Sequence, residues 1–63
     1  MMVTLKEARL AKKLTQKELG DMIGKKLTTI SSYELGTRTP SVEVARQIAV
    51  ALDISLDELH FGK

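Results

Sequence analysis

Apolar residues recur three or four positions apart along much of this 63-residue chain, which is the spacing of amphipathic helices. The pattern is clearest in the stretch QKELGDMIGKKLTTISSY, which starts at position 16. There Leu19, Met22 and Ile23 form the apolar face of one short helix, and further along Ile30 and Tyr33 form the face of a second. The spacing therefore predicts two consecutive short helices near the middle of the chain.

Two glycines indicate how these helices are joined. Gly24 stands where the first apolar pattern stops, and a glycine there accepts a positive φ that turns the chain sharply. Gly20 lies inside the first helix, where glycine costs about 1 kcal/mol against alanine, so its presence indicates that a neighbouring helix approaches too closely for a side chain. Two helices that cross steeply around a tight turn are typical of the helix-turn-helix motif, here at about residues 16–35. The second helix of such a motif can enter the major groove of DNA.

Other start signals place further helices around the motif. Capping boxes stand at 4–7, 15–18 and 55–58, and each predicts a helix that begins one residue inside the box. A Pro-Ser pair at 40–41 is another start signal and predicts a helix over about 42–52. No stretch alternates as a strand would, so the predicted fold class is all-α, with five short helices.

Length and composition limit the classes of protein. The chain makes one domain, 1–63, and a hydrophobic content of 43% supports a small core. The absence of cysteine excludes disulfides and thiolate metal sites, and the single histidine, His60, is expected to be an exposed surface residue. No apolar run approaches a membrane span, so we expect a cytoplasmic protein. With no cysteine nucleophile, one histidine and no glycine-rich phosphate loop, we expect neither an enzyme nor a bound cofactor or metal.

Charge is distributed unevenly along the chain, although the net charge is only +2. Residues 1–26 carry seven Lys and Arg against three Asp and Glu, a net charge of +4, whereas residues 27–63 carry three against five. A basic half favours a polyanionic partner. An ordinary solvated surface of mixed charge accounts for these numbers equally well.

Arg9 stands beside the apolar stripe of the first predicted helix, one residue after Ala8 and four after Leu5. An arginine in that position needs a carboxylate partner or must extend its charged end into solvent. The periodicity alone leaves both arrangements open.

Three segments, LTQKELGDMIG, TTISSYELGTRTPS and IAVALDISLDEL, resemble at these spacings the phage-repressor-like helix-turn-helix family, also called the Xre or Cro/repressor type. The resemblance extends over about 5–59. It implies a compact five-helix, lambda-repressor-like domain that binds operator DNA, usually as a dimer, and regulates transcription. It also implies that Arg9 pairs with Glu34 at the end of the second motif helix, the alternative being that both are merely solvated.

The resemblance further implies a DNA-contacting surface. Gln16 opens the first motif helix, where the family's glutamine contacts a backbone phosphate, and free N–H groups at a helix start favour an anion. The alternative is an ordinary first-turn residue. Leu27, Thr28 and Ser32 occupy base-reading positions, and their methyl and hydroxyl groups can contact thymine methyls and base edges.

Cations on this surface are expected to contact phosphates. Lys25 and Lys26 follow the turn and could also reach a guanine, whereas Arg38 follows the second motif helix and could instead be a free loop residue. Together with neighbouring polar residues, they complete the expected DNA-contact set: Gln16, Lys17, Lys25, Lys26, Leu27, Thr28, Thr29, Ser31, Ser32 and Arg38.

Both turn lysines depart from the family pattern. The family places an apolar residue where Lys25 stands, and a serine or aspartate cap where Lys26 stands. The stem of Lys25 can cover apolar surface while its charge reaches out. Without a capping side chain at Lys26, the second motif helix can start late, with Thr28 as its cap.

These features predict a sequence-specific regulator of transcription that binds double-stranded DNA, and a repressor that acts by occupying its operator. A protein-interaction module, such as the antitoxin of a toxin–antitoxin pair, is the alternative, and we expect it less because the chain ends four residues after Leu59. No membrane or small-molecule partner is expected. Leu56, Leu59 and Phe61 are expected at the interface of a weak homodimer that DNA stabilises, although Phe61 could instead cover the core edge.

Overall fold

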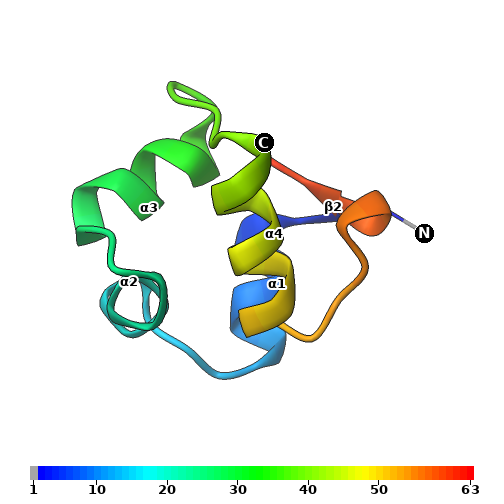
Figure 1. Cartoon of the computed structure of the whole chain (residues 1–63), viewed down its shortest axis with the longest axis horizontal. Helices are drawn as coiled ribbons and strands as arrows, with labels where there is room; N and C mark the ends of the chain where they lie inside the picture. Colours follow the sequence, from blue (N-terminus) through cyan, green and yellow to red (C-terminus); the bar gives the residue numbers. More distant parts are fainter. Residues whose placement is uncertain (1) are drawn as a thin grey trace.

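Within residues 2–63, which the computed structural model describes, four α-helices form most of the fold. They are α1 (Leu5–Ala11), α2 (Gln16–Ile23), α3 (Leu27–Leu35) and α4 (Val42–Ala51). The helices α2 and α3 lie on one side of α1 and α4, and two short strands lie on the other side (Figure 1). The all-α helix-turn-helix fold class is therefore confirmed, but the number of helices is not the expected five.

Side-chain caps explain where three of the helices begin. The Thr4 hydroxyl accepts the backbone N–H of Glu7 at 3.1 Å, and the Glu7 carboxylate accepts that of Thr4 at 2.8 Å. Thr15 and Glu18 repeat this arrangement at the start of α2, and the Ser41 hydroxyl caps α4. The donated backbone N–H of Thr4 also holds the pKa of Glu7 below its ordinary value. The predicted starts of α1, α2 and α4 are confirmed.

The predicted fifth helix is wrong. Only a single 3-10 turn forms, η1 (Leu56–Glu58), and the Ser55 side chain makes no capping hydrogen bond. The chain then becomes extended as β2 (Leu59–His60) and pairs in parallel with β1 (Val3–Thr4). A strand of two residues is too short to show alternation, and its pairing is set by a contact between distant segments. The expectation that the chain contains no strand was wrong for the same reason.

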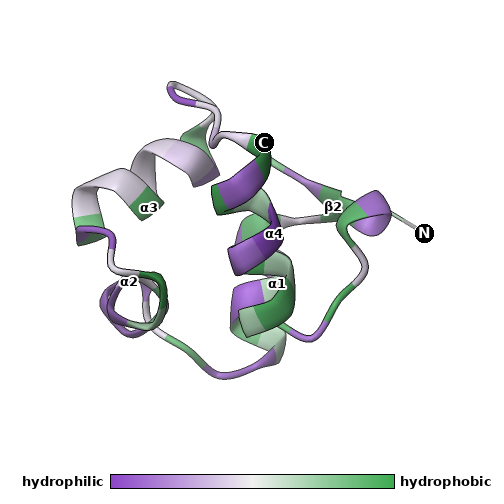
Figure 2. Cartoon of the chain, viewed as in Figure 1, coloured by the Kyte–Doolittle hydropathy of each residue, from purple (hydrophilic) through white to green (hydrophobic). Residues whose placement is uncertain are grey.

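Each α-helix contributes one fully buried large side chain to the core, and these are Leu5, Leu19, Ile30 and Ile48. In Figure 2, the hydrophobic side of α2 lies toward α4 and its hydrophilic side lies away from it. Met22 departs from the prediction because 55% of it is exposed. The buried face of α2 is therefore narrower than its apolar spacing indicates.

The turn between α2 and α3 requires two glycines. Gly24 ends α2 with a φ of +70°, in the left-handed region that glycine accepts without strain. A Cβ on Gly20 would lie 2.5 Å from the carbonyl oxygen of Lys25 and 3.5 Å from Cγ1 of Ile30. The nearest obstacle to a side chain at Gly20 is thus the backbone of the turn, and α3 lies slightly farther away. A backbone hydrogen bond also joins the turn to α2, because the Lys25 N–H donates to the Gly20 carbonyl at 2.8 Å.

Candidate nucleic-acid interface

The first turn of α3 presents the most open of the expected base-reading residues. Leu27 begins the helix and is 46% exposed, and Thr28 beside it is also exposed. Thr29, Ser31 and Ser32 are half-buried. The start of α3 therefore offers methyl groups to solvent, while its middle offers less accessible hydroxyls.

The Ser32 hydroxyl is already engaged within the helix. Its Oγ donates to the Thr28 carbonyl at 3.0 Å, a bond that ties it to the preceding turn of α3. A hydroxyl whose proton is used in this way still has lone pairs that accept hydrogen bonds. In this arrangement Ser32 presents an acceptor, which suits a donor on a base edge, such as the amino group of adenine or cytosine.

The start of α3 differs from the expected one. Lys26 is the N-cap residue, and no side chain caps the helix. Its carbonyl accepts the backbone N–H groups of Thr29 and Ile30, so the helix forms without a polar cap. The prediction that Thr28 caps a late-starting helix is wrong, because Thr28 already lies within α3.

The expected cations differ in how available they are. Lys26 and Arg38 are exposed, whereas Lys25 is half-buried. The Nζ of Lys17 lies 3.0 Å from Oδ2 of Asp21 on the exposed surface of α2. Because Asp21 offsets part of the charge of Lys17, the most available of the expected cations are Lys26 and Arg38, followed by Lys25.

A buried ion pair connects α1 with the end of α3. The Arg9 Nε donates to Glu34 Oε2 at 2.6 Å, and a second guanidinium nitrogen donates to Glu34 Oε1 at 3.3 Å. A third donates to the Leu14 carbonyl at 2.6 Å, just before α2 begins. Arg9 is only 7% exposed and Glu34 only 8%, so the pair is shielded from water. The structure thus contains the pair that the family resemblance implies.

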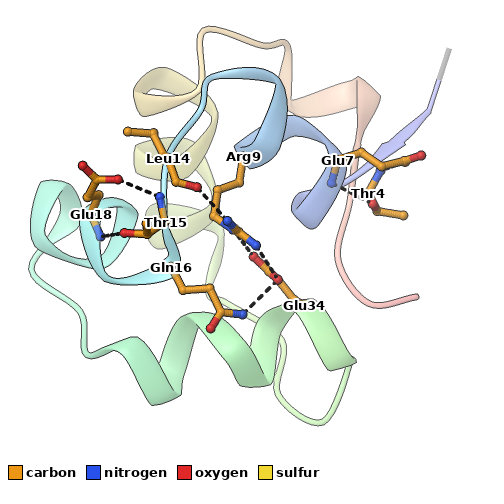
Figure 3. A network of polar contacts seen from close by, with 8 residues as sticks. All are labelled: Thr4, Glu7, Arg9, Leu14, Thr15, Gln16, Glu18 and Glu34. Carbon is orange, nitrogen blue, oxygen red and sulfur yellow. Dashed lines mark hydrogen bonds and ion pairs between the residues drawn. The ribbon is translucent and has the colours of Figure 1, made fainter.

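Gln16 joins this network, which sequence reasoning missed. Its Nε2 donates to Glu34 Oε1 at 3.0 Å, so Glu34 accepts hydrogen bonds from α1 and α2 together (Figure 3). Gln16 and Glu34 lie 18 positions apart on different helices, so no spacing rule brings them together. The side chain expected to contact a phosphate is therefore held from within the protein.

The Arg9, Gln16 and Glu34 side chains of this network line an open hollow of about 360 Å³. Two exposed lysines that the sequence did not assign to the interface, Lys6 on α1 and the last residue, Lys63, also line it. The hollow is lined by Lys6, Arg9, Gln16, Ser31, Glu34, Leu35 and Lys63.

The residues expected at a dimer interface are buried to different degrees within the single chain. Leu59 is only 6% exposed and belongs to the core. Phe61 is half-buried, and its ring stands edge-on to Tyr33 with 6.4 Å between centroids. Of the two roles expected for Phe61, covering the core edge is the one seen in the single chain. Leu56 is half-buried, and His60 is exposed.

Within residues 2–63, no helix has both the length and the apolar character needed to cross a membrane. Over the same residues, no cluster of three or more His, Cys, Asp or Glu side chains could hold a metal ion.

Comparison with known proteins gives concordant matches. The family model HTH_3, described as helix-turn-helix, matches residues 5–59. The chain is 41% identical over 59 residues to an uncharacterized HTH-type transcriptional regulator, YqaE of Bacillus subtilis, with 94% of the chain and 51% of that protein covered. It is 47% identical over 45 residues to the cryptic phage CTXphi transcriptional repressor RstR of Vibrio cholerae, with 71% and 40% covered.

A more distant relative is multiprotein-bridging factor 1 of Candida albicans. It is 34% identical over 59 residues, which cover 94% of the chain and 39% of that protein. The chain thus spans about half the length, or less, of the curated relatives it matches.

Proposed function

The chain belongs to the helix-turn-helix family HTH_3 and is similar to proteins named as transcriptional regulators, so we propose that it regulates transcription. In this proposal it binds double-stranded DNA at specific sequences. The family is one of DNA-binding regulators and not of enzymes. In this proposal α3 enters the major groove and its exposed side chains contact base edges.

The observation that carries this proposal is the exposed start of α3 beside two lysines. A helix with its side chains is about 10–12 Å across, which fits a major groove about 12 Å wide. Leu27 and Thr28 are exposed on the first turn of this helix. Lys25 and Lys26 precede them in a turn whose backbone packs against Gly20, so the position of this surface is fixed by the fold.

Each group on this surface has a distinct role in the proposed complex. The methyl groups of Leu27 and Thr28 contact thymine methyls, and the Ser32 hydroxyl accepts a hydrogen bond from a base amino group. Lys26, Arg38 and the half-buried Lys25 bind backbone phosphates and fix the register of α3 in the groove. Lys17 contributes less, because Asp21 already pairs with it.

We further propose that two copies bind together and that occupancy of the site represses transcription. One short α3 contacts only a few base pairs, and methyl and hydroxyl groups discriminate bases less than bidentate contacts do. Two copies with their α3 helices in successive major grooves, about 34–36 Å apart, would double the length of sequence read. The similarity to a protein named as a transcriptional repressor supports the repressor role.

Selection of bound duplexes from a random pool tests this function. We expect enrichment of a short motif, present twice in inverted orientation with centres about 10–10.5 base pairs apart. A variant with Leu27→Ala and Thr28→Ala should lose the enrichment, whereas Val50→Ala, an exposed change on α4, should keep it. Failure to enrich any sequence would refute the DNA-binding proposal, and a single unrepeated motif would refute the two-copy arrangement.

A further inference from the structure

Besides pairing with Arg9, Glu34 accepts a hydrogen bond from Gln16. We propose that it is a positioning residue that fixes the Gln16 side-chain amide in the orientation needed to donate a hydrogen bond to a DNA phosphate. This inference rests on the proposed function. In this arrangement the buried network affects DNA affinity through Gln16, in addition to stabilising the fold.

The position of Glu34 at the meeting point of three helices makes this possible. Arg9 on α1 holds the Glu34 carboxylate through two nitrogens, and it also binds the Leu14 carbonyl, which leads into α2. Gln16 is the first residue of α2, and its Nε2 donates to Glu34 Oε1 at 3.0 Å. The end of α3 is therefore tied, through Arg9, to the segment that leads into α2 and directly to the first side chain of α2.

The chemistry of the carboxylate fixes which way the amide faces. An ionised carboxylate only accepts hydrogen bonds, so the amide nitrogen of Gln16, and not its oxygen, must face Glu34. An amide nitrogen carries two N–H groups, and Glu34 uses one of them. The second N–H remains free to donate to an anion at the start of α2, where unpaired backbone N–H groups also favour negative charge.

Holding this side chain in advance favours binding. A free glutamine loses rotamer freedom when it binds a phosphate, and restraint in the unbound protein removes that cost from association. The negative charge of Glu34 would by itself repel a phosphate, but Arg9 lies 2.6 Å from it and offsets that charge. Lys6, which lines the same hollow, adds positive charge nearby.

The free protein offers a first test that requires no variant. Hydrogen exchange of side-chain amides by NMR should show one Gln16 N–H protected in comparison with Gln47, an exposed glutamine on α4. On addition of a selected duplex, the other Gln16 N–H should shift while the Gln47 signals stay in place. Equal exchange at both glutamines would overturn the proposed positioning.

A binding cycle gives the decisive test. Gln16→Ala should weaken binding to the selected duplex about tenfold or more, the effect of a lost hydrogen bond to a charged group. In a background of Arg9→Met with Glu34→Leu, the same change should weaken it less than about twofold. Gln47→Ala should have no effect in either background, and thermal unfolding of each variant checks that it is folded.

The outcomes separate this inference from the function on which it rests. If the unmodified chain binds no duplex DNA, the proposed function is wrong. If it binds and Gln16→Ala weakens binding equally in both backgrounds, DNA binding stands and the positioning role of Glu34 is wrong. If the double-variant background does not fold, the exchange measurement on the unmodified chain decides the question.

Discussion

Arg9→Met is expected to lower the free energy of unfolding by about 3–5 kcal/mol, because it leaves the Glu34 carboxylate buried without its cation. Glu34 is only 8% exposed and cannot recover this loss by turning to water. A chain of 63 residues has a total stability of roughly 3–9 kcal/mol. The single change should therefore remove most of the stability of the fold.

A double-mutant cycle in urea, followed by circular dichroism, measures this coupling. Glu34→Leu alone should cost a similar amount, whereas Arg9→Met with Glu34→Leu should recover most of the loss, because apolar replacement of a whole buried pair is often neutral. The exposed pair of Lys17 and Asp21 is the matched control, with an expected coupling of about 0.3–0.5 kcal/mol. Additive effects of the two core changes would mean that Arg9 and Glu34 do not interact in solution.

Affinity for the selected duplex is expected to fall roughly a thousandfold between about 50 and 200 mM salt. When the logarithm of the binding constant is plotted against the logarithm of the salt concentration, each neutralised phosphate contributes about −0.9 to the slope. Lys25, Lys26 and Arg38 of two copies would together neutralise about six phosphates. The result is a large effect that depends on charge and not on base sequence.

Fluorescence anisotropy titrations across this salt range give the slope. Arg38→Ala should make it shallower by about 0.9 for each bound copy. Arg46→Ala is the matched control, because Arg46 is an exposed arginine on α4, outside the expected DNA-contact set, and should leave the slope unchanged. An affinity that does not change with salt would rule out the phosphate contacts assigned here.

Local chemistry made the helix starts predictable, and distant contacts made the chain's end unpredictable. The boxes at Thr4 and Thr15 satisfy backbone groups within three residues, so the local sequence predicts these two helix starts correctly. A similar sequence begins at Ser55, but no capping bond forms there, and at Leu59 the chain becomes extended and pairs with Val3. The spacing of capping residues contains no information about that pairing.

The candidate interface likewise contains some features that the sequence predicts and others that depend on packing. Helical periodicity alone places Thr28 outside and Ile30 inside, and the structure agrees. The bond from Gln16 to Glu34 joins residues that no periodicity relates, and only the packing of three helices reveals it. The missing cap at Lys26 was visible in the sequence, but the conclusion drawn from it was wrong, because backbone hydrogen bonds suffice to start α3 there.

Intermolecular NOEs between the protein and a selected duplex test most directly the central claim that the exposed start of α3 lies in the major groove. The methyl groups of Leu27 and Thr28 should show cross-peaks to thymine methyls or other major-groove protons. The methyl groups of Val50, which is 80% exposed on α4, should show none. Cross-peaks to DNA from Val50, with none from Leu27 and Thr28, would contradict the claim, because the surface that contacts DNA would then be α4.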